Sequence, residues 1–185
     1  MNIWHDIAPE RIKPEVFCAV IEISKGGKNK YELDKDTGML RMDRVLFTST
    51  HYPANYGFIP RTYADDDDPL DVLVLCQEAI LPMTLVDCRP IGVIRMIDDK
   101  SKDEKIIAVP LHDPTMTGYK DIDELPMHTV DEIQHFFEVY KTLENKVTVV
   151  RSFGTAGEAE RLIHRSMLTY FEKFVDKQNK PHRKK

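Results

Sequence analysis

A concentration of carboxylates lies near the middle of the chain. Residues 65–71 read Asp-Asp-Asp-Asp-Pro-Leu-Asp, and the wholly apolar stretch 72–75 follows. Two carboxylates 4 Å apart repel each other by about 1 kcal/mol in water and by about 4 kcal/mol at an effective dielectric of 20. Such crowding costs little on a solvated loop, which is what most charge runs are. In a cleft it is costly unless cations neutralise it.

Two features of this run favour a cation site. Pro69 biases Asp68 toward an extended backbone, so Asp66 and Asp68 share a face by alternation. Asp71 stands at the entrance to the apolar stretch, where a charge is held in place. Carboxylate oxygens are hard ligands that suit Mg²⁺ or Mn²⁺, whereas zinc would require His or Cys. An EF-hand loop is excluded, because Leu70 occupies the fifth position from Asp66 and no glycine follows.

A second acidic group, Asp98 and Asp103, lies in the connection between two predicted strands. A hairpin could bring it beside the first group, and together they could hold more than one divalent ion. Basic and phenolic side chains supply the other half of a phosphate site: Lys30, Arg44, Lys105, Lys141, Tyr52, Tyr56 and Tyr140. Two of the tyrosines lie in residues 52–60, whose prolines and glycine indicate a stiff loop. The Walker, dinucleotide-binding and Gly-x-Ser-x-Gly patterns are absent, so side chains and metals must hold the phosphate.

The elements that must position these residues are strand-like in the first two thirds and helical in the last third. Short apolar or alternating runs predict strands over 16–23, 30–34, 39–47, 72–76, 91–97 and 106–109. Glu22 interrupts an otherwise apolar strand, and Lys30 and Glu32 share one face of the next. Capping boxes at Thr129 and Thr155 predict two helices. This order predicts an α+β fold: a small five-stranded, mostly antiparallel, OB-like β-barrel with flanking strands and two main C-terminal helices.

Composition indicates a soluble, folded chain. It is 42% hydrophobic and 31% charged, without an apolar run long enough to span a membrane, and its net charge of −5 argues against nucleic-acid binding. The N-terminus resembles no secretory signal, so we expect a cytoplasmic protein in which Cys18, Cys76 and Cys88 are reduced structural thiols. Residues 1–176 are predicted to form one domain, and the basic tail 177–185 is predicted to be frayed.

Taken together, these residues resemble the soluble family I inorganic pyrophosphatases of bacterial type. Residues 66–72 match the family signature Asp-x-Asp-Pro-hydrophobic-Asp-hydrophobic, in which Asp65 and Asp67 are variable positions. Phe153 departs from the tryptophan of many members. The resemblance covers residues 14–172 and includes, in order, Glu22, Lys30-Tyr31-Glu32, Asp43-Arg44, Tyr52-Pro53-x-Asn55-Tyr56-Gly57, Arg89-Pro90-x-Gly92-Val93, the Asp98/Asp103/Lys105 loop and His135-Phe136-Phe137-Glu138-x-Tyr140-Lys141.

The resemblance implies Mg²⁺-dependent hydrolysis of inorganic diphosphate to two orthophosphates, with Asp68 accepting a proton from the attacking water. The implied metal ligands are Asp66, Asp71, Asp98 and Asp103. The implied phosphate-binding residues are Lys30, Arg44, Tyr56, Lys105, Tyr140 and Lys141. Three further residues are expected to line the cavity: Glu22, Glu32 and Tyr52. A homohexamer is also implied.

Two other functions stay open at this point. A metal-dependent hydrolase of a nucleotide or polyphosphate would use the same parts. A non-catalytic divalent-metal-binding protein would keep the acids but would not need the basic and phenolic residues.

Overall fold

The computed structural model describes residues 2–176, and the predicted basic tail 177–185 lies outside the described residues. The strands are β1 (Phe17–Ile23), β2 (Asn29–Leu33), β3 (Leu40–Val45), β4 (Asn55–Phe58), β5 (Asp71–Val74), β6 (Leu85–Asp98), β7 (Ser101–Pro110) and β8 (Thr148–Thr155). The α-helices are α1 (Ile3–Asp6), α2 (Met127–Val139) and α3 (Ala156–Tyr170). Short 3₁₀ turns span Pro9–Arg11, Ile122–Glu124 and Thr142–Glu144, and a π-helical segment, Phe171–Asp176, continues α3.

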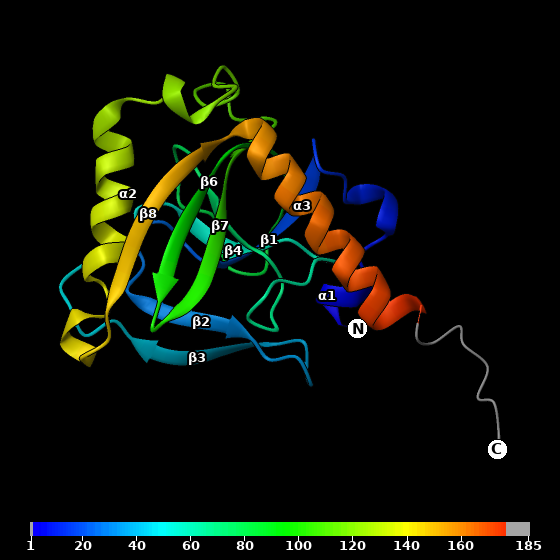
Figure 1. Cartoon of the computed structure of the whole chain (residues 1–185), viewed down its shortest axis with the longest axis horizontal. Helices are drawn as coiled ribbons and strands as arrows, with labels where there is room; N and C mark the ends of the chain where they lie inside the picture. Colours follow the sequence, from blue (N-terminus) through cyan, green and yellow to red (C-terminus); the bar gives the residue numbers. More distant parts are fainter. Residues whose placement is uncertain (1, 177–185) are drawn as a thin grey trace.

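The strands form a closed ring with one further strand attached. The sheet order is β1-β4-β5-β7-β6-β8, and an additional pairing of β1 with β6 closes the ring of five. Within the ring only β5 and β7 run parallel. β2 and β3 form a separate two-stranded sheet at one end of the barrel (Figure 1). The predicted α+β fold with a small, mostly antiparallel barrel is confirmed.

Two helices flank the barrel: α3 crosses one side, and α2 lies beside β8 (Figure 1). Thr155 caps α3 in the predicted capping box with Glu158. The predicted cap at Thr129 is wrong, because α2 begins at Met127 and the Thr129 N–H already donates to the Pro126 carbonyl at 2.9 Å. Within residues 2–176, each helix is too short or too polar to cross a membrane.

β4 lies inside the stretch that the sequence indicated to be a stiff loop. Asn and Gly are poor strand formers, yet all four residues of β4 are buried. The Asn55 amide compensates for its burial, because its Oδ1 accepts from the Lys25 and Ile80 N–H groups and its Nδ2 donates to the Glu78 carbonyl. Tertiary contacts therefore override local propensity here. β8 was also missed, since its burial does not alternate clearly along the strand.

β4 approaches β1 closely at Gly57, which pairs with Ile21 beside a register shift. A Cβ atom at Gly57 would lie 1.8 Å from the Val20 carbonyl oxygen and 2.8 Å from its carbon. Both neighbours are backbone atoms, which cannot turn aside as a side chain can. Glycine at this position therefore sets the distance between β4 and β1, and with it the placement of Tyr56.

We expect Gly57→Ala to lower the free energy of unfolding by about 3 kcal/mol or more, the upper end of the usual cost of overpacking. Denaturant unfolding would measure it. Gly118→Ala is the matched control, because a Cβ there meets no atom within 4 Å. Equal stability of the two variants would contradict the close approach of β4 to β1.

Candidate active site

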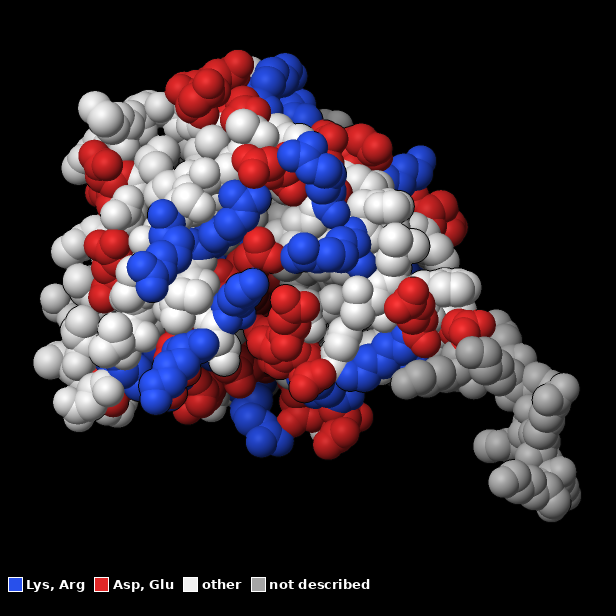
Figure 2. All heavy atoms as spheres, viewed as in Figure 1, with Lys and Arg blue, Asp and Glu red and all other residues white. Residues whose placement is uncertain are grey.

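A polar cavity of about 270 Å³ opens where β2, the end of α2 and the mouth of the barrel meet. The predicted site residues that line it are Glu22, Lys30, Glu32, Tyr56, Asp66, Asp68, Asp71, Asp98, Asp103, Lys105, Tyr140 and Lys141. The structure does not place Arg44 or Tyr52 in its wall. Figure 2 shows acidic side chains gathered near the middle of this face, with basic side chains beside them. The cavity thus combines crowded carboxylates with the cations and phenols that the sequence predicted around them.

Lys105 lies at the centre of the carboxylates and is only 3% exposed. Its Nζ donates to Asp71 Oδ2 at 2.7 Å, to Asp103 Oδ1 at 2.9 Å and to the Tyr56 hydroxyl at 3.2 Å. Asp71 pairs with Lys105 across the parallel β5–β7 ladder, and Asp103 lies two residues away on the same face of β7. Burial disfavours the ammonium, but the two carboxylates outweigh it and raise the pKa of Lys105 well above its ordinary value. Lys105 therefore stays charged.

The Tyr56 hydroxyl donates to the same oxygen of Asp71 that accepts from Lys105. Burial, and then the charge of Asp71, raise the pKa of Tyr56 well above its usual value, which keeps the phenol protonated and a donor. Tyr52 lies behind it, with its ring centroid 5.3 Å from that of Tyr56 and 4.8 Å from that of Phe136. Tyr52 thus supports the cavity wall from the core.

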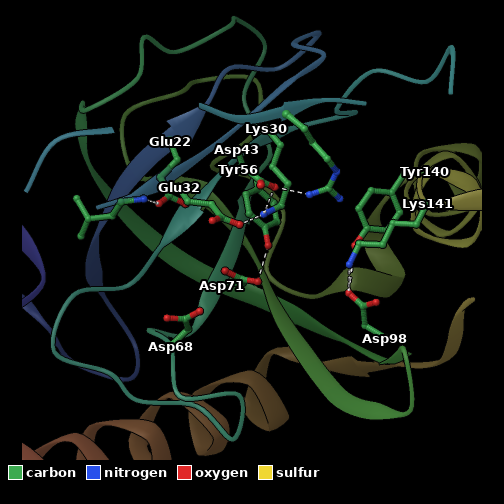
Figure 3. Close-up of polar contacts among 12 residues, drawn as sticks. Glu22, Lys30, Glu32, Asp43, Tyr56, Asp68, Asp71, Asp98, Tyr140 and Lys141 are labelled. Atoms are coloured by element: carbon green, nitrogen blue, oxygen red, sulfur yellow. Dashed lines mark hydrogen bonds and ion pairs between the residues drawn. The ribbon is translucent and has the colours of Figure 1, made fainter. Parts of the chain in front are cut away.

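The acidic loop, residues 65–68, brings Asp66 and Asp68 to the cavity on one side of Asp71. In Figure 3 the carboxylates of Asp68, Asp71 and Asp98 point toward a common space. Burial raises the pKa of Asp66, and the nearby charges of Asp71 and Asp103 raise it further. The ionised form of Asp66 is therefore disfavoured until positive charge is supplied.

Glu22 is the charge that interrupts the apolar strand β1, and it is buried at the cavity edge. Its Oε1 accepts the Leu33 N–H at 2.7 Å, which joins β1 to the end of β2 (Figure 3). Burial, followed by repulsion from Asp71, raises the pKa of Glu22 to about 8. Glu22 is thus largely protonated at neutral pH when only the chain's own charges surround it.

Asp98 faces the cavity from the end of β6. Its Oδ2 accepts from the Lys141 ammonium and, at 3.4 Å, from the Tyr140 hydroxyl, two residues that follow α2 directly (Figure 3). Its Oδ1 is buried without a hydrogen-bond partner. Buried carboxylate oxygens almost always have a partner, so Asp98 retains an acceptor for a further cation or donor.

Arg44 lies opposite Lys30 on the two-stranded sheet. Its Nε donates to Glu144 Oε1 at 2.9 Å and its Nη1 donates to Asp43, while Nη2 is buried without a partner. Lys30 contacts Glu32 and lies 3.6 Å from Asp43. Arg44 therefore retains the two N–H bonds of Nη2, which can donate to an oxygen ligand next to Lys30.

The residues of this cavity fit divalent cations by their chemistry. The candidate metal ligands are all carboxylates, and oxygen ligands favour a hard cation. Asp98 Oδ1 has no hydrogen-bond partner, and burial raises the pKa of Asp66, so a bound cation would stabilise both side chains. Across residues 2–176, no three His, Cys, Asp or Glu side chains are already grouped closely enough to enclose an ion. The Lys105 ammonium lies between two of the carboxylates, 2.7 Å from Asp71 Oδ2 and 2.9 Å from Asp103 Oδ1.

Reasoning from the sequence missed several residues of the cavity wall, Lys35 and Trp4 among them. Lys35, in the turn after β2, forms an ion pair with Asp68, and its Nζ lies 5.5 Å from the ring centre of Trp4. Trp4 lines the same cavity and donates to the Thr62 carbonyl at 2.9 Å. No local pattern marks Lys35, whereas a single tryptophan in 185 residues was a signal worth following.

Comparison with known proteins points to one family. A model of the inorganic pyrophosphatase family matches residues 19–171. Soluble inorganic pyrophosphatase 2 of Chlamydomonas reinhardtii is 48% identical over 172 residues, which are 93% of this chain and 90% of that protein. Soluble inorganic pyrophosphatase 1 of Arabidopsis thaliana is 49% identical over 91% of this chain and 80% of its own. The crystal structure of an inorganic pyrophosphatase from Thermus thermophilus superposes with a TM-score of 0.85 at 38% identity, covering 92% of this chain and 99% of that one.

We expect Mg²⁺ to stabilise the fold and Asp66→Asn to abolish most of that effect. An ion at 100 times its dissociation constant adds about 2.7 kcal/mol, which raises Tm by about 5–10 °C in a chain of this size. The raised pKa of Asp66 means that its ionised form opposes folding at neutral pH, so without metal the variant should melt no lower than the wild type.

Thermal unfolding with and without Mg²⁺ tests this expectation. Asp131→Asn, which removes an exposed charge on α2, is the control and should keep the full rise. If Asp66→Asn also keeps the full rise, Asp66 does not bind the ion.

Proposed function

Because the chain belongs to the inorganic pyrophosphatase family, whose metal-dependent enzymes hydrolyse diphosphate, we propose that the carboxylate cavity is the site of this reaction. The observation that carries the proposal is that carboxylates, lysine ammonium groups and tyrosine hydroxyls line one cavity of about 270 Å³. A purely metal-binding protein needs the acids but has no use for Lys30, Lys141 and Tyr140. Diphosphate needs both, because its negative charge must be neutralised by metals and by fixed donors.

Mg²⁺ is the activating ion in this proposal, with Mn²⁺ as an alternative that suits the same oxygen ligands. The ligands would be Asp66, Asp71, Asp98 and Asp103. A bound divalent ion lowers the pKa of a coordinated water and neutralises phosphate oxygens. The unpartnered Oδ1 of Asp98 and the raised pKa of Asp66 support this assignment.

The phosphate groups would be held by donors on three sides of the cavity. Lys30 and Arg44 come from the two-stranded sheet, and the free Nη2 of Arg44 can donate to a phosphate oxygen while its Nε and Nη1 donate to Glu144 and Asp43. Tyr140 and Lys141 come from the end of α2. Tyr56 and Lys105 complete the set from the barrel and remain a neutral phenol and a charged ammonium at neutral pH.

Asp68 would accept the proton of the attacking water. A carboxylate is a weak base at neutral pH, so its main contribution is to orient the water and receive the proton at one fixed place. Its pairing with Lys35 supports this role, because that contact holds the side chain at the cavity edge. Glu22 and Glu32 would act less directly, through the water and cations around them.

We also propose self-association, as a homohexamer, in a reducing compartment such as the cytoplasm. Leu81, Met83 and Leu85 expose apolar surface near the start of β6, which supports an interface. The three cysteines are all free thiols, which supports a reducing environment. Light scattering coupled to gel filtration would give the number of subunits.

Phosphate release tests the function directly. Diphosphate with Mg²⁺ should release phosphate rapidly, a chelator should stop it, and ATP or polyphosphate in place of diphosphate should release little. Release from ATP at a comparable rate would instead indicate a broader phosphoanhydride hydrolase. Mg²⁺ binding without release from any of these substrates would contradict an enzymatic role.

Asp68→Asn should lower kcat by about 10²- to 10⁴-fold, the usual contribution of a positioned proton acceptor, and leave the rise of Tm with Mg²⁺ largely unchanged. Asp65→Asn is the matched control at a variable position of the same loop and should have nearly wild-type kcat. Loss of both turnover and the Mg²⁺ effect in Asp68→Asn would show that Asp68 binds the ion instead.

A further inference from the structure

Asp67, between Asp66 and Asp68, has a backbone conformation that its residue type rarely adopts. Its φ is +69°, in the left-handed region. Residues with a Cβ are uncommon in this region, although Asp tolerates it better than most. The side chain points outward and is 85% exposed, so burial does not hold it there. Two backbone hydrogen bonds close this turn, from the Ala64 N–H to the Asp68 carbonyl at 2.8 Å and from the Asp67 N–H to the Ala64 carbonyl at 3.3 Å, and the contacts of the Asp67 carboxylate add to them.

Two side chains from outside the acidic loop contact that carboxylate. The Tyr63 hydroxyl donates to Asp67 Oδ1, and Lys173 Nζ lies 3.3 Å from the same oxygen. The Lys173 ammonium also lies 3.6 Å from the centre of the Tyr63 ring, within the range of a cation–π interaction. Asp67, Tyr63 and Lys173 thus contact one another pairwise, and we call this group the loop clamp.

Lys173 is delivered by the π-helical segment Phe171–Asp176, which continues α3. Its neighbour Phe174 anchors this segment: the Phe174 ring packs against Tyr63 at 5.5 Å and against Trp4 at 5.2 Å. Wider π turns in helices often occur at functional sites. The segment therefore connects the last described turn of the chain to the acidic loop.

We propose that the loop clamp is a positioning device: Lys173 and Tyr63, acting through Asp67, hold Asp66 and Asp68 in their working places in the cavity. The inference rests on the proposed roles of Asp66 and Asp68. Asp67 itself lies outside the cavity wall and touches no reacting atom. The Asp67–Lys173 ion pair is exposed, and exposed ion pairs add little to global stability. Their effect should therefore appear in the order of residues 64–69 and in metal affinity, with little change in Tm.

The size of the effect follows from the population of the ordered loop. If binding requires the ordered loop, loosening it raises the apparent dissociation constant in inverse proportion to the remaining ordered fraction. Contacts of this kind predict a change of about threefold to tenfold, the larger of which corresponds to about 1.4 kcal/mol. Saturating Mg²⁺ should restore the order of the loop, because an ion bound to Asp66 selects it.

Lys173→Met is the principal test, since it removes the ammonium and keeps an apolar stem. The Mg²⁺ concentration that gives half-maximal hydrolysis of diphosphate should rise about threefold to tenfold in this variant. At saturating Mg²⁺ its kcat should be near the wild-type value. Lys13→Met, which removes an exposed lysine far from the loop in sequence, is the control and should match the wild type. A variant that merely folds less well would lose activity at every Mg²⁺ concentration, and that result would overturn the clamp.

Hydrogen exchange provides a readout that does not depend on catalysis. The Ala64 N–H donates to the Asp68 carbonyl at 2.8 Å, and the Asp68 N–H donates to Asp66 Oδ1 at 3.3 Å. Lys173→Met should speed exchange in residues 64–69 while strands β5 and β7 stay protected. Unchanged exchange in the loop would overturn the proposal.

A double variant separates a shared action from two independent effects. Asp67→Asn keeps a residue type that tolerates positive φ and still accepts from Tyr63, but it loses the charge that attracts Lys173. If both side chains act through one contact, Asp67→Asn combined with Lys173→Met should resemble either single variant. Additive losses would contradict the clamp.

The clamp and the proposed function can fail separately. If Asp68→Asn loses turnover but Lys173→Met behaves as Lys13→Met does, the clamp is wrong and the catalytic assignment stands. If Asp68→Asn keeps its turnover, the assignment of Asp68 is wrong, and hydrogen exchange still decides whether Lys173 orders the loop.

Discussion

The pairing of the buried Lys105 ammonium with Asp71 and Asp103 is the interaction on which the rest of the site depends. A charge this deeply buried persists only when it is paired and hydrogen-bonded, and here two carboxylates and the Tyr56 hydroxyl provide three contacts. Asp71 and Lys105 are 34 residues apart. They meet because β5 and β7 are the one parallel pair of the ring, so the chain must run along all of β6 before it returns beside β5. The β5–β7 pairing, which is one side of the closed ring, therefore also brings Asp71 to Lys105.

The protein's own cations stabilise the ionised forms of the cavity carboxylates only in part. One ammonium cannot neutralise Asp66, Asp71 and Asp103 together. Burial first, and then repulsion from Asp71, raise the pKa values of Asp66 and Glu22. Natural proteins keep such unfavourable clusters where function needs them and compensate elsewhere. The compensation here lies in the tightly packed barrel, where much of β1, β5 and β7 is fully buried. The buried strands behind the cavity keep the crowded carboxylates close together at its surface.

The parts of the site that the sequence predicted are those controlled by the two-residue period of a strand. That period placed Lys30 with Glu32 and Asp103 with Lys105 on shared faces. Asp66 and Asp68 do both line the cavity, but a turn with Asp67 in the left-handed region brings them there, and not the extended alternation that the sequence predicted. The strand period does not predict contacts between separate elements of the fold. Nothing local shows that the turn at Lys35 folds onto Asp68, or that Tyr52 lies behind Tyr56 instead of in the wall. β4 was missed for the same reason, since Asn55 and Gly57 oppose a strand locally and are held in one by their surroundings.

The two sides of the cavity are fixed by different means, and this division has a physical consequence. Asp71, Asp103 and Lys105 lie on ring strands, whose ladders open only when the barrel itself opens. Asp66 and Asp68 lie on a short loop that two lysine ion pairs contact: Lys35, from the turn after β2, pairs with Asp68, and Lys173, from the segment after α3, pairs with Asp67. Segments with few buried contacts open at much lower free energy than the core. The strand-borne half of the site therefore persists as long as the fold does, whereas the loop-borne half has an order that its neighbours and bound cations can adjust without disturbing the barrel.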